Sequence, residues 1–178
     1  MIGIVARNHP DKDVPTFVNA AANLASTNDD VHFVLVGKEL DDTNPVLRKQ
    51  IAETGFGDRF HLLGSRSDVP AVLNAFDIAG LSSVTEAFPI SIIEAMAVGI
   101  PFVSTDVGDA REVIDVTGRV VPVSDPAAMA SAWRELLALD ANMLAALGVA
   151  ARSRVEQHYQ LERTTDLYRT AYRAAIGR

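Results

Sequence analysis

The feature that most constrains this chain is a regular alternation of short apolar runs with longer segments of helical periodicity. Ile2 to Ala6 is apolar and partly β-branched, which predicts a buried strand, and Val31 to Val36 has the same character. Between them, residues 14–26 place apolar side chains on one helical face. Strands that alternate with helices form βαβ units, so the pattern predicts a parallel sheet.

The alternation continues along the chain. Further strands are predicted at 60–63, 78–81, 102–104 and 119–121, and further helices at 46–53, 69–76, 90–98, 110–114, 126–139, 142–159 and 162–175. The fold class is therefore α/β, a Rossmann-like doubly wound parallel sheet of about six strands with helices on both faces and a helical C-terminus. Residues 1–178 are predicted to form a single domain. The aromatic residues of the last helices are expected to anchor the core: Trp133, Tyr159, Tyr168 and Tyr172.

Composition excludes several classes of function. The net charge of -7 argues against broad binding to nucleic acid or to anionic membranes. There is no cysteine, which excludes disulfides and thiolate chemistry. No apolar run reaches about 18 residues, so no transmembrane helix is predicted. The first residues lack the charged leader of a signal peptide, and we expect a cytoplasmic location.

The common nucleotide and hydrolase motifs are absent. Gly55-Phe56-Gly57 begins like G-x-G-x-x-G, but Phe60 occupies the last position and the stretch precedes a strand. No G-x-x-x-x-G-K-[ST] and no G-x-S-x-G occurs. The sequence therefore supports neither a dehydrogenase nor a P-loop enzyme nor a hydrolase of those types.

Charged side chains instead follow the carboxyl ends of the predicted strands. Arg7 and Lys12 follow the first strand, Arg66 the third and Glu86 the fourth, with Glu94 on the next helix. In a doubly wound sheet these loops share one edge, where ligands bind. Cations and a helix N-terminus suit a pyrophosphate, while carboxylates accept bonds from sugar hydroxyls. Together they indicate a nucleotide-sugar site.

Each of these residues also has a simpler interpretation. Ser91 and Glu94 fit the S-x-x-E capping box, in which the glutamate bonds to its own helix start. An alternative partner for Arg66 is Asp68, in a surface ion pair. Arg7 and Lys12 also fit solvated loop charges.

The histidines show no metal-ligand spacing, and we expect them to be structural or solvated, with no metal site. They are His9, His32, His61 and His158.

Several ordered motifs resemble those of retaining glycosyltransferases of family 4, also called glycosyl transferase group 1. Residues 85–101, TEAFPISIIEAMAVGIP, resemble the E-x7-E segment of that family, and the resemblance continues through 103–108 and 112–114. Residues 4–13 resemble its first strand and phosphate loop, and residues 62–69 resemble its base-binding loop. The resemblance extends from Ile2 to about Tyr172, nearly the whole chain.

The resemblance implies the C-terminal, donor-binding domain of the GT-B fold. The substrate would be a nucleotide-diphosphate sugar of the UDP, GDP or ADP type, with no cofactor, no metal and retention of configuration. Arg7, Lys12 and Glu86 would be catalytic, the two cations on the leaving diphosphate and the carboxylate on the transferred sugar. The other donor-binding positions implied by the resemblance are Gly37, Arg66, Ala87, Phe88, Pro89, Ile90, Ser91 and Glu94. The family usually has glycine in place of Ala87, and a second glycine near Glu39.

The same resemblance implies a missing partner. The N-terminal acceptor domain of a GT-B enzyme is absent from residues 1–178, so we expect these residues alone to be inactive. Residues 162–175 resemble the segment that packs back on that domain, and they would leave apolar surface exposed. No nucleic-acid partner is expected, and membrane contact would arise only through the missing domain. Two alternatives stay open: a stand-alone nucleotide-sugar-binding module without transfer activity, and another GT-B enzyme such as a sugar epimerase or phosphorylase.

Overall fold

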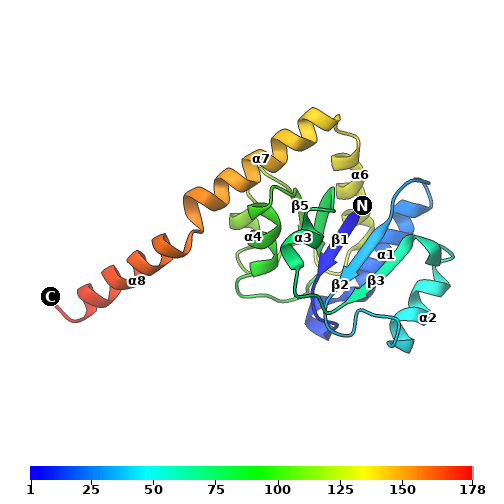
Figure 1. Cartoon of the computed structure of the whole chain (residues 1–178), viewed down its shortest axis with the longest axis horizontal. Coiled ribbons are helices and arrows are strands. Elements are labelled where there is room, and N and C mark those ends of the chain that lie inside the picture. Colours follow the sequence, from blue (N-terminus) through cyan, green and yellow to red (C-terminus); the bar gives the residue numbers. More distant parts are fainter. Residues whose placement is uncertain (178) are drawn as a thin grey trace.

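Six parallel strands form a single sheet in the order β3-β2-β1-β4-β5-β6 (Figure 1). The computed structural model describes residues 1–177. The strands are β1 Ile2–Val5, β2 Phe33–Val36, β3 Phe60–Gly64, β4 Ile78–Leu81, β5 Phe102–Thr105 and β6 Arg119–Val121. The predicted Rossmann-like fold class is thereby confirmed, with the first strand of the chain, β1, at the centre of the sheet.

The helices connect these strands and complete the C-terminus. They are α1 Val14–Ala25, α2 Pro45–Glu53, α3 Val69–Leu73, α4 Ile90–Ala97, α5 Ala110–Ile114, α6 Pro126–Leu137, α7 Ala141–His158 and α8 Leu161–Ala175, with 3-10 turns η1 Pro10–Lys12 and η2 Gly57–Arg59. Helix α3 ends at Leu73, before the predicted end at residue 76. Its N-cap residue is Asp68, but the Asp68 carboxylate bonds to Arg66 instead of to the helix start.

Polar caps explain where other helices begin. The Asn44 side chain accepts bonds from Val46 and Leu47 N–H at 3.1 Å each, which starts α2. The Asp125 carboxylate accepts a bond from Ala128 N–H at 2.8 Å, which starts α6. Such caps satisfy N–H groups that have no partner within the helix.

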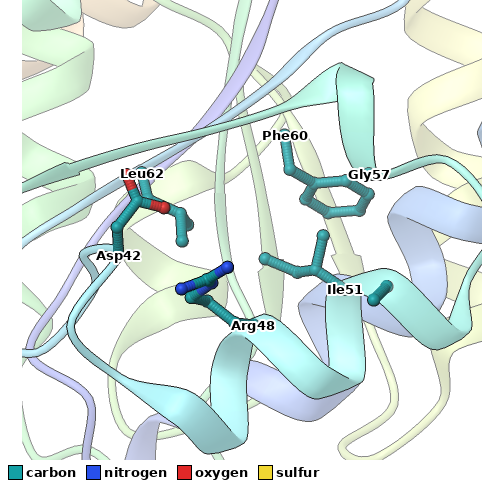
Figure 2. A pocket seen from close by; sticks show the side chains of 7 residues that line it. Asp42, Arg48, Ile51, Gly57, Phe60 and Leu62 are labelled. Carbon is teal, nitrogen blue, oxygen red and sulfur yellow. The ribbon is translucent and has the colours of Figure 1, made fainter.

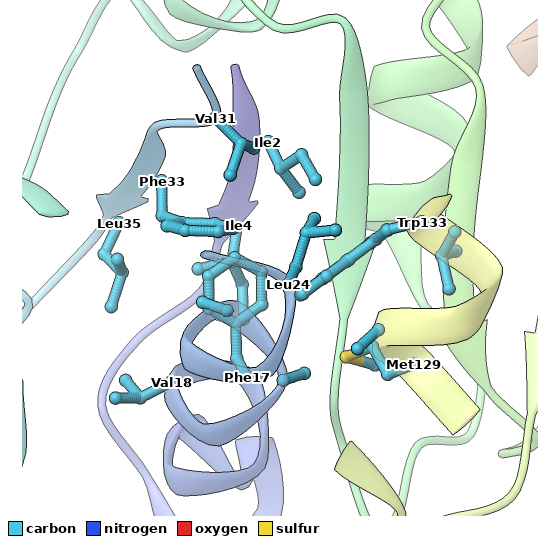
Figure 3. Packing of buried hydrophobic residues seen from close by; sticks show 14 of the residues in the cluster. Ile2, Ile4, Phe17, Val18, Leu24, Val31, Phe33, Leu35, Met129 and Trp133 are labelled. Carbon is cyan, nitrogen blue, oxygen red and sulfur yellow. The ribbon is translucent and has the colours of Figure 1, made fainter. Parts of the chain in front are cut away.

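The sheet buries a different apolar cluster on each face. In β2, Phe33 and Leu35 belong to one cluster, and Val34 belongs to the other, as the two-residue repeat of a strand requires. The first cluster lies under α1, α2 and α6, where the Phe17 and Trp133 rings meet edge to face at 5.2 Å (Figure 3). The second lies under α3, α4, α5 and α7. Helices therefore cover both faces, as predicted.

Helix α8 departs from this packing. It contains no buried residue, and it extends away from the sheet beyond α7 (Figure 1). Trp133 is fully buried as predicted, but the prediction was wrong for Tyr168 and Tyr172, which are 61% and 67% exposed. Helical periodicity shows which side chains share a face, but not whether another element covers that face.

Within residues 1–177, no single helix is both long and apolar enough to span a membrane. A bent pair, Pro126–Leu137 with Ala141–Ala175, meets the criteria by length and composition only.

Candidate functional site

The candidate site lies between β1 and β4, where the connections to the next strands run towards opposite edges of the sheet. Strands β1 and β4 are neighbours at the centre of the sheet, yet α1 packs on one face and α4 on the other. The loops that follow β1 and β4 therefore separate at the carboxyl edge, the position at which open α/β sheets bind ligands.

The two loops meet through Lys12 and Glu86. The Lys12 ammonium donates to Glu86 Oε1, although the residues are 74 positions apart in the chain. The Lys12 side chain is 21% exposed and that of Glu86 is 14% exposed, so the pair is largely shielded from water. The Ser83 hydroxyl also donates to Glu86 Oε1, at 2.7 Å. Two donors on one oxygen fix the carboxylate and leave its second oxygen for another partner.

Three further hydrogen bonds, all to backbone carbonyls, hold the loops together. The Val84 N–H donates to the Asp11 carbonyl at 2.8 Å, and the Ser82 hydroxyl donates to the Lys12 carbonyl at 2.8 Å. The Thr105 hydroxyl, from β5, donates to the Ser83 carbonyl at 2.5 Å. Because the Ser82 and Thr105 side chains are fully buried, the bonds of their hydroxyls are shielded from competing water.

A turn that the sequence did not predict orients Lys12. Residues 10–12 form η1, and Asp13 then adopts a left-handed backbone with φ 42° and ψ 51°. Aspartate tolerates that conformation better than most residues. Its carboxylate caps α1 by accepting bonds from the Thr16 hydroxyl at 2.7 Å and the Thr16 N–H at 3.3 Å. The reversal between η1 and α1 places Lys12 at the sheet edge.

The backbone of Glu86 and Ala87 rests against Gly108 in the turn after β5. A Cβ atom at Gly108 would lie 2.2 Å from the Ala87 carbonyl oxygen and 2.5 Å from that of Glu86. The Asp109 N–H donates to the Ala87 carbonyl at 3.3 Å. Ala87 itself is exposed and lies outside the positive-φ region, so an alanine fits the backbone where the resembled family usually has glycine.

Helix α4 begins directly after this loop. Pro89 is buried and occupies the N-cap, without a side-chain cap bond, while Phe88 and Ile90 are 44% and 62% exposed. Ser91 therefore lies inside the helix, and the capping-box alternative is wrong. The serine follows the N-cap by two positions, so it cannot fill that role. Glu94 is exposed, and among residues 1–177 its side chain has no hydrogen-bond or ion-pair partner.

The remaining predicted site residues lie on the loops after β1, β2 and β3. Arg7 is exposed directly after β1. Gly37 has φ +141°, and a Cβ atom there would lie 1.7 Å from the Ala6 carbonyl oxygen, so only glycine fits. The Gly37 N–H donates to the Gly64 carbonyl at 2.8 Å, which joins the second and third loops.

Arg66 forms the surface pair given as an alternative. Its Nε and Nη2 donate to the two carboxylate oxygens of Asp68 at 2.8 and 2.7 Å. That bidentate bond raises the pKa of Arg66 and lowers the pKa of Asp68. The structure thus unites Lys12 and Glu86 directly, whereas Arg66 is already paired.

Two features lie away from this edge. The His32 and His61 rings stack, with His32 Nδ1 and His61 Nε2 3.0 Å apart. Within residues 1–177, no group of three or more His, Cys, Asp or Glu side chains is arranged to hold a metal ion. A pocket of about 260 Å³ lies between α2 and β3, and no predicted site residue lines it. Its lining includes Arg48, Ile51 and Phe60 (Figure 2).

Comparisons with known proteins agree with the fold and with the resemblance. Residues 1–139 match the family model described as glycosyl transferases group 1. The chain is 25% identical over 185 residues to the lipopolysaccharide core biosynthesis mannosyltransferase LpsB of Rhizobium meliloti, across 98% of this chain and 52% of LpsB. The chain thus spans about half the length of that curated relative, and about a third of several others.

Two solved structures show the same fold. Anabaena HepE in complex with UDP superposes with a TM-score of 0.87 at 24% identity, across 97% of this chain and 48% of HepE. The C-terminal domain of the group 1 glycosyl transferase LpcC from Francisella tularensis superposes with a TM-score of 0.79 at 23% identity, across 90% of this chain and 86% of that one. On the family match over residues 1–139, this chain belongs to the glycosyl transferases of group 1.

Proposed function

We propose that residues 1–178 form the donor-binding domain of a retaining GT-B glycosyltransferase of family 4, which holds a nucleotide-diphosphate sugar. The observation that carries the proposal is the Lys12–Glu86 pair at the point where the loops after β1 and β4 separate. A cation and a carboxylate side by side match the two parts of such a donor, its diphosphate and its sugar.

Transfer of a sugar from a diphosphate gives Lys12, Arg7 and Glu86 distinct proposed roles. As the bond between sugar and diphosphate breaks, negative charge grows on the phosphate oxygens, and the Lys12 ammonium with the exposed Arg7 guanidinium would stabilise it. The free oxygen of Glu86 would accept a hydrogen bond from a sugar hydroxyl. Before donor binds, Lys12 donates to Glu86, so the diphosphate would have to draw the ammonium away from that carboxylate.

The N-terminus of α4 supplies further donors. The Ile92 N–H donates to the carbonyl of the N-cap residue Pro89 at 3.2 Å. The N–H groups of Ile90 and Ser91, the first two residues of the helix, precede any intrahelical bond and would be available to a phosphate. Exposed Glu94, which has no partner among residues 1–177, remains available to bind ribose hydroxyls. Paired Arg66 would contribute less charge, and the base would contact mainly backbone near Gly64.

UDP is the first candidate for the nucleotide, because the HepE structure contains UDP. The partial coverage of LpsB and HepE supports an acceptor domain outside residues 1–178, and it favours half of an enzyme over a stand-alone binding module. The match to the separate C-terminal domain of LpcC supports a donor half that folds as one unit. Residues 1–178 alone are expected to transfer no sugar.

Calorimetric titration of residues 1–178 with UDP, GDP and ADP tests this proposal. We expect one nucleotide to bind, and Lys12→Ala to weaken its affinity about tenfold or more, the effect of losing a charged hydrogen bond. Lys49→Ala is the matched control, because Lys49 is an exposed lysine of α2 that pairs with Glu53. Failure of all three nucleotides to bind, or equal binding by Lys12→Ala, would overturn the assignment.

A further inference from the structure

The loop that carries Glu86 makes an aromatic contact far along the chain. The rings of Phe88 and Tyr159 lie with centroids 6.2 Å apart and planes inclined by 51°. Phe88 is the next residue but one after Glu86, and it remains 44% exposed. Aromatic pairs in this geometry attract each other beyond the area that they bury. The contact therefore restrains the loop through the Phe88 side chain, whereas the Gly108 turn contacts the carbonyls of Glu86 and Ala87.

Tyr159 is held in place by the end of α7 and by the apolar cluster. It ends α7, where its N–H donates to the Val155 carbonyl at 2.9 Å, and it packs against the apolar cluster under α4 and α5. The neighbouring Arg154 donates from Nε to the Val113 carbonyl at 2.9 Å, and its Nη1 lies 3.1 Å from Asp115 Oδ2 in an ion pair. These contacts tie α7 to the end of α5. The ring that meets Phe88 is thus held by the body of the domain.

Among residues 160–177, no side chain is buried. Gln160 is extended, with φ -68° and ψ 146°, and α8 follows with no buried residue. Within residues 1–177, Tyr159 is therefore the last residue that packs against the apolar clusters, and its ring contacts Phe88 in the loop of the candidate site.

The loop is held from two directions. From the β5–α5 turn, Gly108 and the Asp109 N–H support the carbonyls of Glu86 and Ala87. From α7, the Tyr159 ring supports the side chain of Phe88. We propose that Tyr159 is a positioning residue for the donor sugar, holding Phe88 and thereby the Glu86–Pro89 loop where the sugar would meet it. This inference rests on the proposed donor site.

The test separates the sugar from the nucleotide. Affinities of the wild type for UDP and for UDP-glucose, UDP-galactose and UDP-N-acetylglucosamine first identify a sugar nucleotide that binds more tightly than UDP. The affinities for that sugar nucleotide and for UDP are then measured on Tyr159→Ala and Tyr159→Phe. In Tyr159→Ala we expect that added affinity to fall about threefold to tenfold, the size of an aromatic contact, while UDP affinity stays within about twofold. Tyr159→Phe keeps the ring and should behave as wild type. Tyr168→Ala is the control, because it removes an exposed tyrosine of α8.

Hydrogen exchange gives a readout that needs no ligand. In Tyr159→Ala, the amides of residues 86–88 should exchange faster while those of β4 and α6 stay unchanged. The positioning role would be overturned if Tyr159→Ala lost the same affinity for UDP as for the sugar nucleotide, or if the ratio of the two affinities stayed at its wild-type value. It would also be overturned if the amides of residues 86–88 exchanged at the wild-type rate, or if exchange became faster throughout the domain. Wild type that binds UDP but gains nothing from any sugar would overturn it as well, while still supporting the donor site. Wild type that binds no nucleotide would instead refute the proposed function.

Discussion

Lys12 and Glu86 lie 74 residues apart in the chain, yet their side chains form an ion pair that is mostly shielded from solvent. The pair joins the loop after β1 to the loop after β4, so it serves the fold as well as the candidate site. Because both charges are partly desolvated, the loss of one partner leaves the other poorly compensated.

A double-mutant cycle should detect this coupling. Lys12→Ala and Glu86→Ala are each expected to lower the free energy of unfolding, and the cycle should give a coupling of about 1–3 kcal/mol in urea denaturation. Lys49 and Glu53 provide a control, since their nitrogen and oxygen lie 3.7 Å apart on exposed α2. Exposed pairs of that kind couple by about 0.3–0.5 kcal/mol. Equal coupling in both cycles would contradict a special role for the shielded pair.

Removal of the Thr105 hydroxyl should destabilise the loop after β4, because the hydroxyl bonds to the Ser83 carbonyl in that loop. Thr105→Val keeps the shape of the side chain but leaves the buried Ser83 carbonyl without its donor. We expect a loss of about 1–3 kcal/mol in unfolding free energy, the cost of an unsatisfied buried polar group. Thr105→Ser retains the hydroxyl and loses only a methyl group, so it should cost less. If Thr105→Ser proved the more damaging substitution, packing and not the hydrogen bond would explain the site.

Gly108 should tolerate no side chain. Gly108→Ala places a Cβ atom within 2.5 Å of two carbonyl oxygens, at a φ of +47° that disfavours alanine. A loss of about 1–3 kcal/mol is expected in thermal or urea unfolding, because the Glu86–Ala87 backbone must shift. Gly57→Ala is the matched control, since its nearest neighbour would be Ile51 Cγ2 at 4.0 Å. That substitution should change stability by less than about 1 kcal/mol, and similar losses in the two variants would refute the steric account.

Tyr159 should make the domain sensitive to alkali. Burial raises the pKa of the Tyr159 phenol above its ordinary value, with nearby Glu112 and Asp109 adding to the rise and Arg154 opposing it. The folded state therefore holds this proton more tightly than the unfolded chain does. The resulting stabilisation is complete below the unfolded pKa of about 10, and it is lost as pH rises through the folded pKa.

Urea denaturation between about pH 8 and 11 checks this sign. Tyr159→Phe should lose less stability over that range than wild type does, because phenylalanine has no proton to release. Tyr172→Phe, which alters an exposed tyrosine of α8, should follow the wild-type curve. A wild-type slope in Tyr159→Phe would assign the alkaline loss to other groups.

The architecture was predictable because it rests on local periodicity. The apolar runs at Ile2–Val5 and Phe33–Val36 are too short and too β-branched for helices, and each is followed by a helical pattern. Parallel order and two covered faces then follow from connection rules that hold for any such chain. The same rules predict that the loops of Arg7, Lys12, Arg66 and Glu86 lie at one edge of the sheet.

The pairing of side chains at that edge did not follow from the sequence. Lys12 meets Glu86 because Asp13 adopts a left-handed turn and because buried hydroxyls join two distant loops, and neither feature has a sequence period. Arg66 bonds to Asp68 and Ser91 falls inside α4, both decided by local geometry that spacing leaves open. Tyr159 was predicted only as a core anchor, since its contact with Phe88 links residues 71 positions apart.

Sequence alone therefore determined the sheet, its helices and the edge at which we propose that the donor binds. Hydrophobic burial acts on the periodicity of each segment, and that information is present in every stretch of the chain. Tertiary structure alone decided which charged groups meet, which helix remains uncovered and what supports the Glu86 loop. Those outcomes depend on distances of a few ångströms between segments that only the folded chain brings together.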